Sequence, residues 1–283
     1  MKLTFLGTGT SCGVPVIGCQ CEVCRSTDPR DKRTRCSVLV ETDDTRLLID
    51  CGPDFRQQIL PQPFRKIDGI LVTHAHYDHM GGMDDIRPYC QFGEINVYAD
   101  PIARKGLLEM LPYCFAEHRY PGVPAIQLHE IHPHEPLTFG DIEVVPFTVM
   151  HGQLPILAYR LSPLSSLQAK RASSSAQFFA SKASKLERSP FSSLAYITDM
   201  KTIDEAEMQY LEGVKVLVVN ALRFDKPHHS HQLVDDAIAF ARRVGAERTL
   251  LIHSCHDIGL HAEVNKKMPA GIELAYDGMV IEI

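Results

Sequence analysis

The chain has 283 residues, of which 45% are hydrophobic, 23% charged and 7% aromatic, and it contains no tryptophan. These are ordinary globular proportions, which exclude a disordered chain, a collagen and a coiled coil. The formal charge of −6 excludes a global positive field that would recruit nucleic acid or an anionic membrane surface.

Short runs of β-branched and apolar residues, bounded by Gly, Pro and Asp, predict strands along most of the chain. In order they are Lys2–Leu6, Cys36–Glu41, Arg46–Asp50, Gly69–Thr73, Ile95–Ala99, Ile142–Thr148, Ile156–Leu161, Leu194–Thr198, Val214–Val219 and Thr249–His253. Apolar residues at helical spacing predict helices over Ile102–Leu111, Thr202–Leu211 and, most clearly, Gln232–Val244. Strands with helices interspersed indicate a layered α/β architecture. Because no repeat or linker divides the chain, we expect a single domain over residues 1–283.

The segment Leu161–Ser193 differs in composition from the rest of the chain. It contains eleven serines, no glycine, five Lys or Arg and one acidic residue, Glu187. Because it lies between two predicted strands, we interpret it as an insertion in a hairpin, with a helical pattern around Gln177–Leu186. A mobile surface loop is the first interpretation, and an arm that grips the substrate is the alternative.

Cysteine and histidine usage points toward metal binding. The chain has nine cysteines and fourteen histidines. No segment approaches the roughly 20 apolar residues that span a bilayer, and the N-terminus has no long apolar stretch of the secretory type. We therefore expect a soluble, cytoplasmic protein, in which an odd number of cysteines indicates metal sites rather than a disulfide framework.

A dense group of metal-binding side chains follows the predicted strand that ends at Thr73. His74, His76, Asp78 and His79 place three imidazoles and a carboxylate within six residues. Buried together without a metal, these groups would suffer large desolvation costs. Imidazole nitrogen and carboxylate oxygen are ligands that divalent transition metals prefer. The segment therefore predicts a metal site, with a solvated histidine-rich loop as the alternative.

This segment resembles the H-x-H-x-D-H signature of the metallo-β-lactamase superfamily. Further motifs of that superfamily follow in the expected order at the ends of predicted strands: Asp50-Cys51-Gly52, His151, Asp199 and His253. The resemblance covers essentially the whole chain except the serine-rich insertion. It implies an αββα sandwich with its active site at the C-terminal ends of strands.

The same resemblance implies the role of each ligand in a centre of two divalent metal ions. The first ion would be held by His74, His76 and His151, the second by Asp78, His79 and His253, and Asp199 would bridge both. Asp78 would serve as a catalytic residue as well as a ligand, and Asp50 would orient a ligand histidine. Such ions lie roughly 3.5–4 Å apart and share a hydroxide. Mn, Zn or Fe all suit these ligands.

A second metal site is predicted at Cys19, Cys21 and Cys24, which form a C-x-C-x2-C cluster in a loop. Three thiolates this close bind zinc readily, and a fourth ligand would close a tetrahedral structural site. A disulfide with a spare cysteine, or a loop of free thiols, are the alternatives. We expect the fourth ligand to be His256, because residues three apart on a turn can point to different sides, leaving His253 for the two-metal cleft.

Three motifs together narrow the resemblance to the PhnP type, the phosphoribosyl cyclic phosphate phosphodiesterases and their relatives. They are the opening Gly-Thr-Gly-Thr-Ser-Cys-Gly-Val-Pro, the cysteine cluster and the H-x-x-H that begins at His253. This family places a catalytic histidine just before a helix. His231 is the best positional match and His229 is its rival, while a loop whose histidines only face solvent is the alternative.

The ligand set favours a hydrolase, most directly a phosphodiesterase cleaving a small or cyclic phosphate ester, with His231 assisting the leaving group. A tRNA 3′-processing nuclease resembling ribonuclease Z is the alternative, because that family carries its tRNA-binding arm where the basic insertion lies. The net charge and the cysteine cluster argue against it. A non-enzymatic metal-binding scaffold is the third hypothesis. We expect a small-molecule substrate, no membrane partner and, by analogy with relatives, a homodimer.

Overall fold

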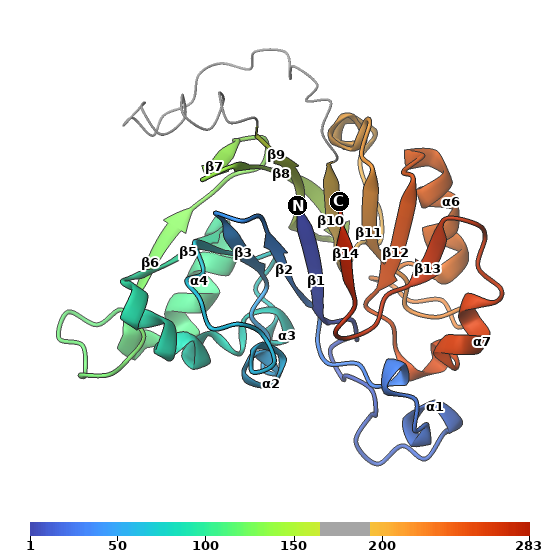
Figure 1. The fold of residues 1–283 in the computed structure, drawn as a ribbon, viewed down its shortest axis with the longest axis horizontal. Coiled ribbons are helices and arrows are strands. Elements are labelled where there is room, and N and C mark those ends of the chain that lie inside the picture. Colours follow the sequence, from blue (N-terminus) through green and yellow to red (C-terminus); the bar gives the residue numbers. More distant parts are fainter. Residues whose placement is uncertain (165–192) are drawn as a thin grey trace.

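The computed structural model describes residues 1–164 and 193–283 (Figure 1). Most of the serine-rich insertion, including the predicted helical pattern around Gln177–Leu186, lies outside these residues. The strands on either side of the insertion are described. Strand β9 (Leu154–Pro163) pairs antiparallel with β10 (Leu194–Ile197), with Leu161 opposite Leu194.

Within the described residues, the strands form two sheets of seven strands each. The first sheet has the order β14-β1-β2-β3-β4-β5-β6, with β1 Lys2–Gly7, β2 Ser37–Glu41, β3 Arg46–Ile49, β4 Gly69–Leu71, β5 Ile95–Ala99, β6 Ile126–Glu130 and β14 Val280–Glu282. The second has the order β13-β12-β11-β10-β9-β8-β7, with β7 Leu137–Phe139, β8 Ile142–His151, β11 Val216–Asn220, β12 Arg248–Ile252 and β13 Ile272–Leu274. Strands β3 to β6 run parallel in one sheet and β10 to β13 in the other.

Alternation of side chains along the strands builds the layers. In β3, Leu47 and Ile49 join a buried cluster with residues of the second sheet such as Tyr159 and Tyr196, whereas Leu48 points to the opposite face and packs beneath helices. Because successive side chains of a strand point to opposite faces, one core lies between the sheets and one beneath each helical layer. This arrangement confirms the predicted αββα sandwich (Figure 1).

Helices cover the outer face of each sheet. Over the first sheet lie α2 Phe55–Ile59, α3 Tyr77–Met80, the 3₁₀ helix η2 Met83–Phe92 and α4 Pro101–Met110; over the second lie η4 Glu205–Leu211, α6 Val234–Val244 and α7 His261–Asn265. Helix α4 begins with Pro101 after Asp100, whose carboxylate accepts a 2.7 Å hydrogen bond from Ala103 N. Shorter pieces are α1 Glu22–Arg25, η1 Pro29–Asp31, η3 Pro112–Cys114 and η5 His256–Ile258.

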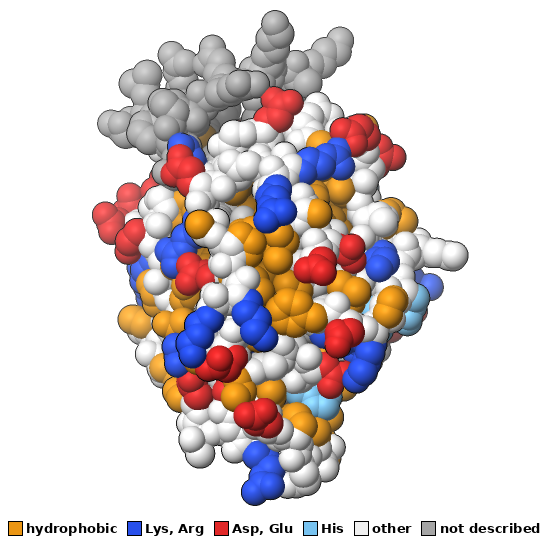
Figure 2. Space-filling view, turned by 90° about the vertical axis from the view of Figure 1, so that its right-hand side faces the viewer, with side chains coloured by type: hydrophobic (Ala, Val, Ile, Leu, Met, Phe, Trp, Pro, Cys, Tyr) orange, Lys and Arg blue, Asp and Glu red, His pale blue; other side chains and the backbone are white. Residues whose placement is uncertain are grey.

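The outer face that carries α6 and α7 bears charged side chains of both signs around apolar ones, and neither sign dominates it (Figure 2). Among the described residues, no helix has the length and apolar character needed to cross a membrane.

The predicted strands are all present, with ends shifted by a few residues. One helix prediction is wrong: Thr202–Leu211 is not an α-helix but contains the 3₁₀ helix η4 over Glu205–Leu211. The carboxylate of Glu207 in η4 has two partners. Its Oε1 lies 2.8 Å from Nε2 of His134, and its Oε2 accepts a hydrogen bond of 3.0 Å from Thr148 N. These contacts tie η4 to β8 and to the segment before β7. Strands β6, β7, β13 and β14 were not predicted.

Candidate active site

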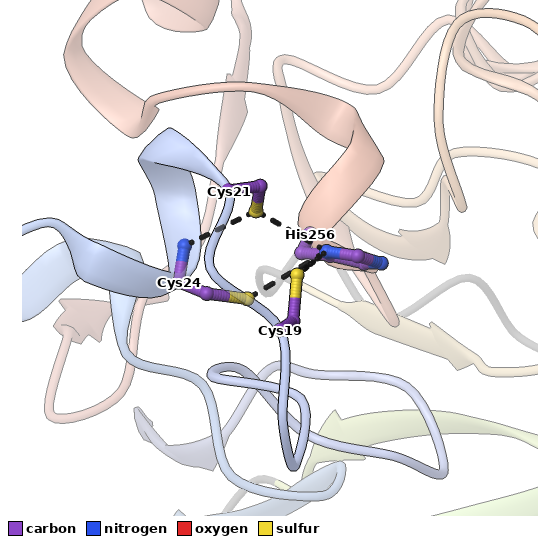
Figure 3. A group of neighbouring side chains, drawn as sticks. All are labelled: Cys19, Cys21, Cys24 and His256. Atoms are coloured by element: carbon purple, nitrogen blue, oxygen red, sulfur yellow. Dashed lines mark hydrogen bonds between the residues drawn. The ribbon is translucent and has the colours of Figure 1, made fainter.

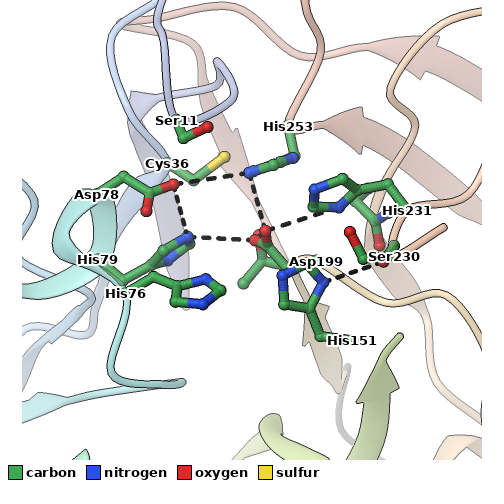
Figure 4. Close-up of polar contacts among 12 residues, drawn as sticks. Ser11, Cys36, His76, Asp78, His79, His151, Asp199, Ser230, His231 and His253 are labelled. Atoms are coloured by element: carbon green, nitrogen blue, oxygen red, sulfur yellow. Dashed lines mark hydrogen bonds and ion pairs between the residues drawn. The ribbon is translucent and has the colours of Figure 1, made fainter. Parts of the chain in front are cut away.

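The predicted metal ligands meet where strands of both sheets end (Figure 4). His74 follows β4, and His79 lies in the short helix α3 that comes next. His151 ends β8, while Asp199 and His253 follow β10 and β12. Because strands of opposite sheets supply them, these ligands come together only when the two sheets pack on each other.

Three of the site residues adopt a left-handed backbone conformation within two residues of the end of a strand. Their φ angles are 61° at Asp50, 55° at Asp199 and 55° at His253. Residues with a Cβ populate this region sparsely, and such conformations persist where the surrounding structure imposes them, commonly at functional sites. Each strand therefore ends abruptly at a side chain of the site.

The first group of ligands is formed by His74, His76 and His151, whose ring nitrogens lie within 4.8 Å of one another. Nδ1 of His151 donates to the carbonyl of Ser230 at 3.0 Å. Nδ1 of His74 lies 3.0 Å from Thr73 Oγ1, and this hydroxyl donates onward to the Asp50 carboxylate. Both rings thus use Nδ1–H within the protein, which leaves the Nε2 lone pair for a metal.

The second group consists of Asp78, His79 and His253. Nε2 of His79 lies 3.3 Å from Asp78 Oδ2 and 3.2 Å from Asp199 Oδ2. Nε2 of His253 lies 3.0 Å from Asp199 Oδ1 and 4.0 Å from Asp78 Oδ2. The two oxygens of Asp199 therefore face different histidines. Donor atoms of Asp199 also lie within 4.8 Å of those of His74 in the first group.

The buried nitrogens of the site face carboxylate oxygens without well-aligned hydrogen bonds. Nε2 of His79, Nε2 of His253 and Nδ1 of His231 make no hydrogen bond of standard geometry, although each lies within 4 Å of an oxygen of Asp199. Nitrogen lone pairs and carboxylate oxygens that converge in this way are the arrangement a divalent ion requires.

The electrostatics of the site follow from burial and from the paired charges. Burial alone would lower the pKa of His253, but Asp199 raises it to about 9. Burial would raise the pKa of Asp199, but His253 and His79 hold it well below its usual range. Burial also lowers the pKa of His74 well below the usual value. The opposite shifts of His253 and Asp199 both follow from their close pairing.

Asp50 lies behind the centre, as its predicted orienting role requires. Its Oδ2 accepts a 2.7 Å hydrogen bond from His79 Nδ1, and its Oδ1 accepts one of 2.8 Å from Thr73 N. Burial raises the pKa of Asp50, a shift that His79 opposes. Thr73 was not singled out from the sequence, although it directly precedes the histidine motif.

Of the two rival histidines, His231 lies in the site. It is buried, its Nδ1 is 3.7 Å from Asp199 Oδ1, and its ring centroid is 4.7 Å from those of both His151 and His253. Burial, together with the charge of His253, lowers the pKa of His231 to about 3. His229 is exposed and stacks on His228 with ring centroids 4.5 Å apart.

The cysteine cluster and His256 come together as a separate group (Figure 3). The sulfurs of Cys19, Cys21 and Cys24 lie 3.2, 3.3 and 3.6 Å from Nδ1 of His256. All nine cysteines lie in the described part of the chain and all are free. The structure therefore does not contain the disulfide that was the alternative. The backbone N–H of Cys24 lowers the pKa of the Cys21 thiol to about 6. Four converging N and S donors fit a tetrahedral zinc site.

A cavity of about 310 Å³ lies between the two groups. It contacts the histidine and carboxylate groups through His231 and the cysteine cluster through His256. Ser11 lines it and is also among the residues drawn around the ligand groups in Figure 4. The remaining lining residues are Thr10, Cys12, Val16, Leu222, Arg223, His228 and Cys255.

Sequence comparison identifies related proteins. The family model described as the beta-lactamase superfamily domain matches residues 45–254. A Porphyromonas gingivalis protein named octanoyltransferase is 39% identical over 280 residues, which are 99% of this chain but 51% of that protein. A ribonuclease Z of Methanopyrus kandleri is 25% identical over 138 residues, covering 47% of this chain and 46% of that one. The chain thus spans about half the length of the first relative. The match to the second covers about half of each protein.

Several solved structures have the same fold as this chain. A diphosphatase from the PhnP family superposes with a TM-score of 0.81 at 35% identity, covering 99% of this chain and 96% of that one. Zn²⁺-bound PqqB from Methylobacterium extorquens has a TM-score of 0.76 at 17% identity, with 100% of both chains covered. The short form of human tRNase Z has a TM-score of 0.69 at 18% identity, covering 100% of this chain and 99% of that one. The last two likenesses concern the fold alone.

Proposed function

Because this chain belongs to the metallo-β-lactamase superfamily, and within it to the PhnP family, we propose that it is a metal-dependent phosphodiesterase that hydrolyses a small phosphate ester. The family itself is the one predicted from the motifs. The observation that carries the proposal is the position of Asp199, whose oxygens lie within reach of His74 in the first ligand group and of His79 and His253 in the second.

We propose that the first ion binds His74, His76 and His151, the second binds Asp78, His79 and His253, and Asp199 bridges them. Mn or Zn suits this mixed nitrogen and oxygen donor set, and zinc suits the cysteine cluster. Two bound ions at this place would polarise phosphoryl oxygens and lower the pKa of a water molecule toward neutrality.

The chain's own residues would orient the reaction. His231 stands at the side of Asp199, with Nδ1 3.7 Å from Oδ1, so its ring is placed to hydrogen-bond a phosphoryl or leaving-group oxygen. Lys201 donates from Nζ to the carbonyl of His231 at 3.1 Å and so holds this loop in place. Asp78 has an oxygen within 3.3 Å of His79 Nε2, from where it can also accept a proton or hydrogen bond from the attacking water.

The adjoining cavity supports a small substrate. Its volume of about 310 Å³ lies at the lower end of the range of small-molecule pockets, about 300–1,000 Å³. The hydroxyls of Thr10 and Ser11 and the guanidinium of Arg223 are among its polar groups. We propose that the alcohol part of the ester binds here, next to His231.

A tRNA 3′-processing nuclease is the second candidate. The similarity to a ribonuclease Z and the serine-rich basic insertion favour it. The formal charge of −6 disfavours it, because tRNA binding depends on neutralising phosphates.

The name octanoyltransferase belongs to a relative of which nearly half has no counterpart in this chain. We propose that this chain corresponds to the hydrolase half of such a protein and that acyl transfer is not its reaction. The site supports this, because it presents histidines and carboxylates arranged for metal ions.

One panel of assays tests the proposal. The purified protein, loaded with Mn or Zn, is offered bis(p-nitrophenyl) phosphate, nucleoside 2′,3′-cyclic monophosphates, ribosyl 1,2-cyclic phosphates and a tRNA precursor. We expect turnover of one of the small esters and none of the tRNA precursor. Cleavage of the tRNA precursor alone would instead support the second candidate.

A further inference from the structure

Asn220, the last residue of β11, is fully buried and binds one backbone residue twice. Its Oδ1 accepts a hydrogen bond of 2.8 Å from Met200 N, and its Nδ2 donates to Met200 O at 2.9 Å. Met200 directly follows Asp199 and lies beyond the end of β10. The side-chain amide of Asn220 therefore forms with the Met200 backbone the two hydrogen bonds that a neighbouring strand would form. It does so beyond the point where the pairing of β10 with β11 ends.

These two hydrogen bonds bear directly on the conformation of Asp199. The φ angle of Asp199 is 55°, a region that residues with a Cβ adopt when the surroundings impose it. Asn220 fixes the N–H and the C=O of the next residue. The direction in which the Asp199 carboxylate leaves the backbone is thereby fixed as well.

The same short segment is bonded to the loop of His231. The carbonyl of Met200 also accepts a hydrogen bond of 3.2 Å from Gln232 N. Nζ of Lys201 donates to the carbonyl of His231 at 3.1 Å. His231 and Gln232 are thus both hydrogen-bonded to the segment Met200–Lys201, which Asn220 also binds.

The segment is also bonded beside His151. Lys201 N donates to Met150 O at 2.7 Å, and Met150 N donates to Thr202 O at 2.9 Å. Met150 is the neighbour of His151 in β8. The segment of residues 199–202 consequently joins three side chains of the cleft: Asp199, His231 and His151.

We propose that Asn220 is a positioning residue, which sets the relative geometry of Asp199, His231 and His151 through its paired hydrogen bonds to Met200. It touches neither substrate nor metal. The role in turnover rests on the proposed function, whereas the role in metal binding can be measured without any substrate.

The experiment compares Asn220→Ala and Asn220→Asp with the full-length wild type. The Asp variant retains the acceptor for Met200 N and loses the donor to Met200 O. The matched control is Asn265→Ala, because Asn265 also binds a backbone N–H, that of Leu274 at 2.7 Å, but does so in α7. For each protein we would measure the Mn dissociation constant, the thermal midpoint, kcat and KM.

We expect Asn220→Ala to weaken Mn binding by about 10–100-fold, as supports behind metal ligands commonly do, and to lower kcat at saturating Mn with KM little changed. Asn220→Asp should show at least as large a loss in both, because a buried carboxylate oxygen would face the Met200 carbonyl oxygen. Asn265→Ala should lower the thermal midpoint while leaving Mn affinity and kcat at wild-type values.

A third variant keeps the inference testable if Asn220→Ala does not fold. Lys201→Met removes only the hydrogen bond to the His231 carbonyl, so kcat should fall while Mn affinity stays unchanged. Wild-type Mn affinity and kcat in a folded Asn220 variant would overturn the inference. Weakened Mn binding in the Asn220 variants, beside a wild type that cleaves no phosphate ester, would uphold the inference and overturn the proposed function.

Discussion

Asp50 accepts a 2.7 Å hydrogen bond from Nδ1 of His79, and both side chains are fully buried. A carboxylate in this position fixes the tautomer of the ring and increases the basicity of Nε2, the atom that faces Asp78 and Asp199. Asp50 is therefore coupled to the centre through one imidazole.

Replacing Asp50 by Asn should weaken the second ion, because the amide carries no charge and can present its NH₂ group to His79. We expect a loss of about 10–100-fold in metal affinity, with zinc retained at the cysteine cluster. Metal titration with elemental analysis measures both. Asp141→Asn is the control, since Asp141 lies in the turn between β7 and β8 and accepts hydrogen bonds of 2.6 Å from Thr42 and Thr45. Equal losses in the two variants would contradict the coupling.

Replacing Asp199 by Ala should abolish phosphodiester hydrolysis while the protein stays folded. The physical reason is that a single carboxylate faces ligands of both groups. Elemental analysis should find the two ions of the cleft lost and one zinc per chain retained. A fully active variant would remove the two-metal assignment.

Replacing His231 by Ala should lower turnover far more than metal content. A group that assists proton transfer or charge development contributes about 10²–10⁴-fold. His229→Ala serves as the comparison, because His229 is exposed and its ring stacks on His228 instead. If the loss of turnover appears in the His229 variant and not in the His231 variant, the positional match to the family is off by two residues.

Replacing Cys21 by Ser should lower thermal stability and also weaken the second ion. His256 faces the cysteine sulfurs, while His253 faces Asp199 three residues earlier in the chain. Zinc bound at the cluster would fix the turn that aims His253, and supports of this kind change metal affinity by about 10–100-fold.

The ion held by His74, His76 and His151 should be less affected by the Cys21 change. Metal titration followed by rescue with excess Mn separates the two effects. Wild-type stability with wild-type affinities would remove the zinc assignment, and lost stability with unchanged affinities would remove only the coupling.

The interior strands and the ligand motifs could be predicted because their signals are local. Runs such as Leu47–Ile49 are apolar on both faces, since helices cover one side and the other sheet covers the second. The strands β7, β13 and β14 are each three residues long, partly exposed and at sheet edges. Whether such a segment forms a strand depends on its pairing with a neighbouring strand. Propensity alone carries little information there.

The supporting residues of the site could not be predicted in the same way. A histidine motif is recognisable from its spacing, but Asn220 acts on Met200, twenty residues earlier in the chain, through a contact that only the packing of β10 beside β11 creates. Nothing in the neighbouring sequence marks such an asparagine. The choice of His231 over His229 likewise depends on which ring the loop buries.

The spread of the ligands along the chain has a consequence for biosynthesis. The cysteine cluster begins at Cys19 and is completed by His256, and the second ion's ligands begin at Asp78 and are completed by His253. Neither set is whole until the ribosome has added these late residues and β12 has joined its sheet. An ion held by either group would thus be acquired at the end of translation or after it, and a nascent chain halted before β12 would expose thiols and imidazoles without forming either group.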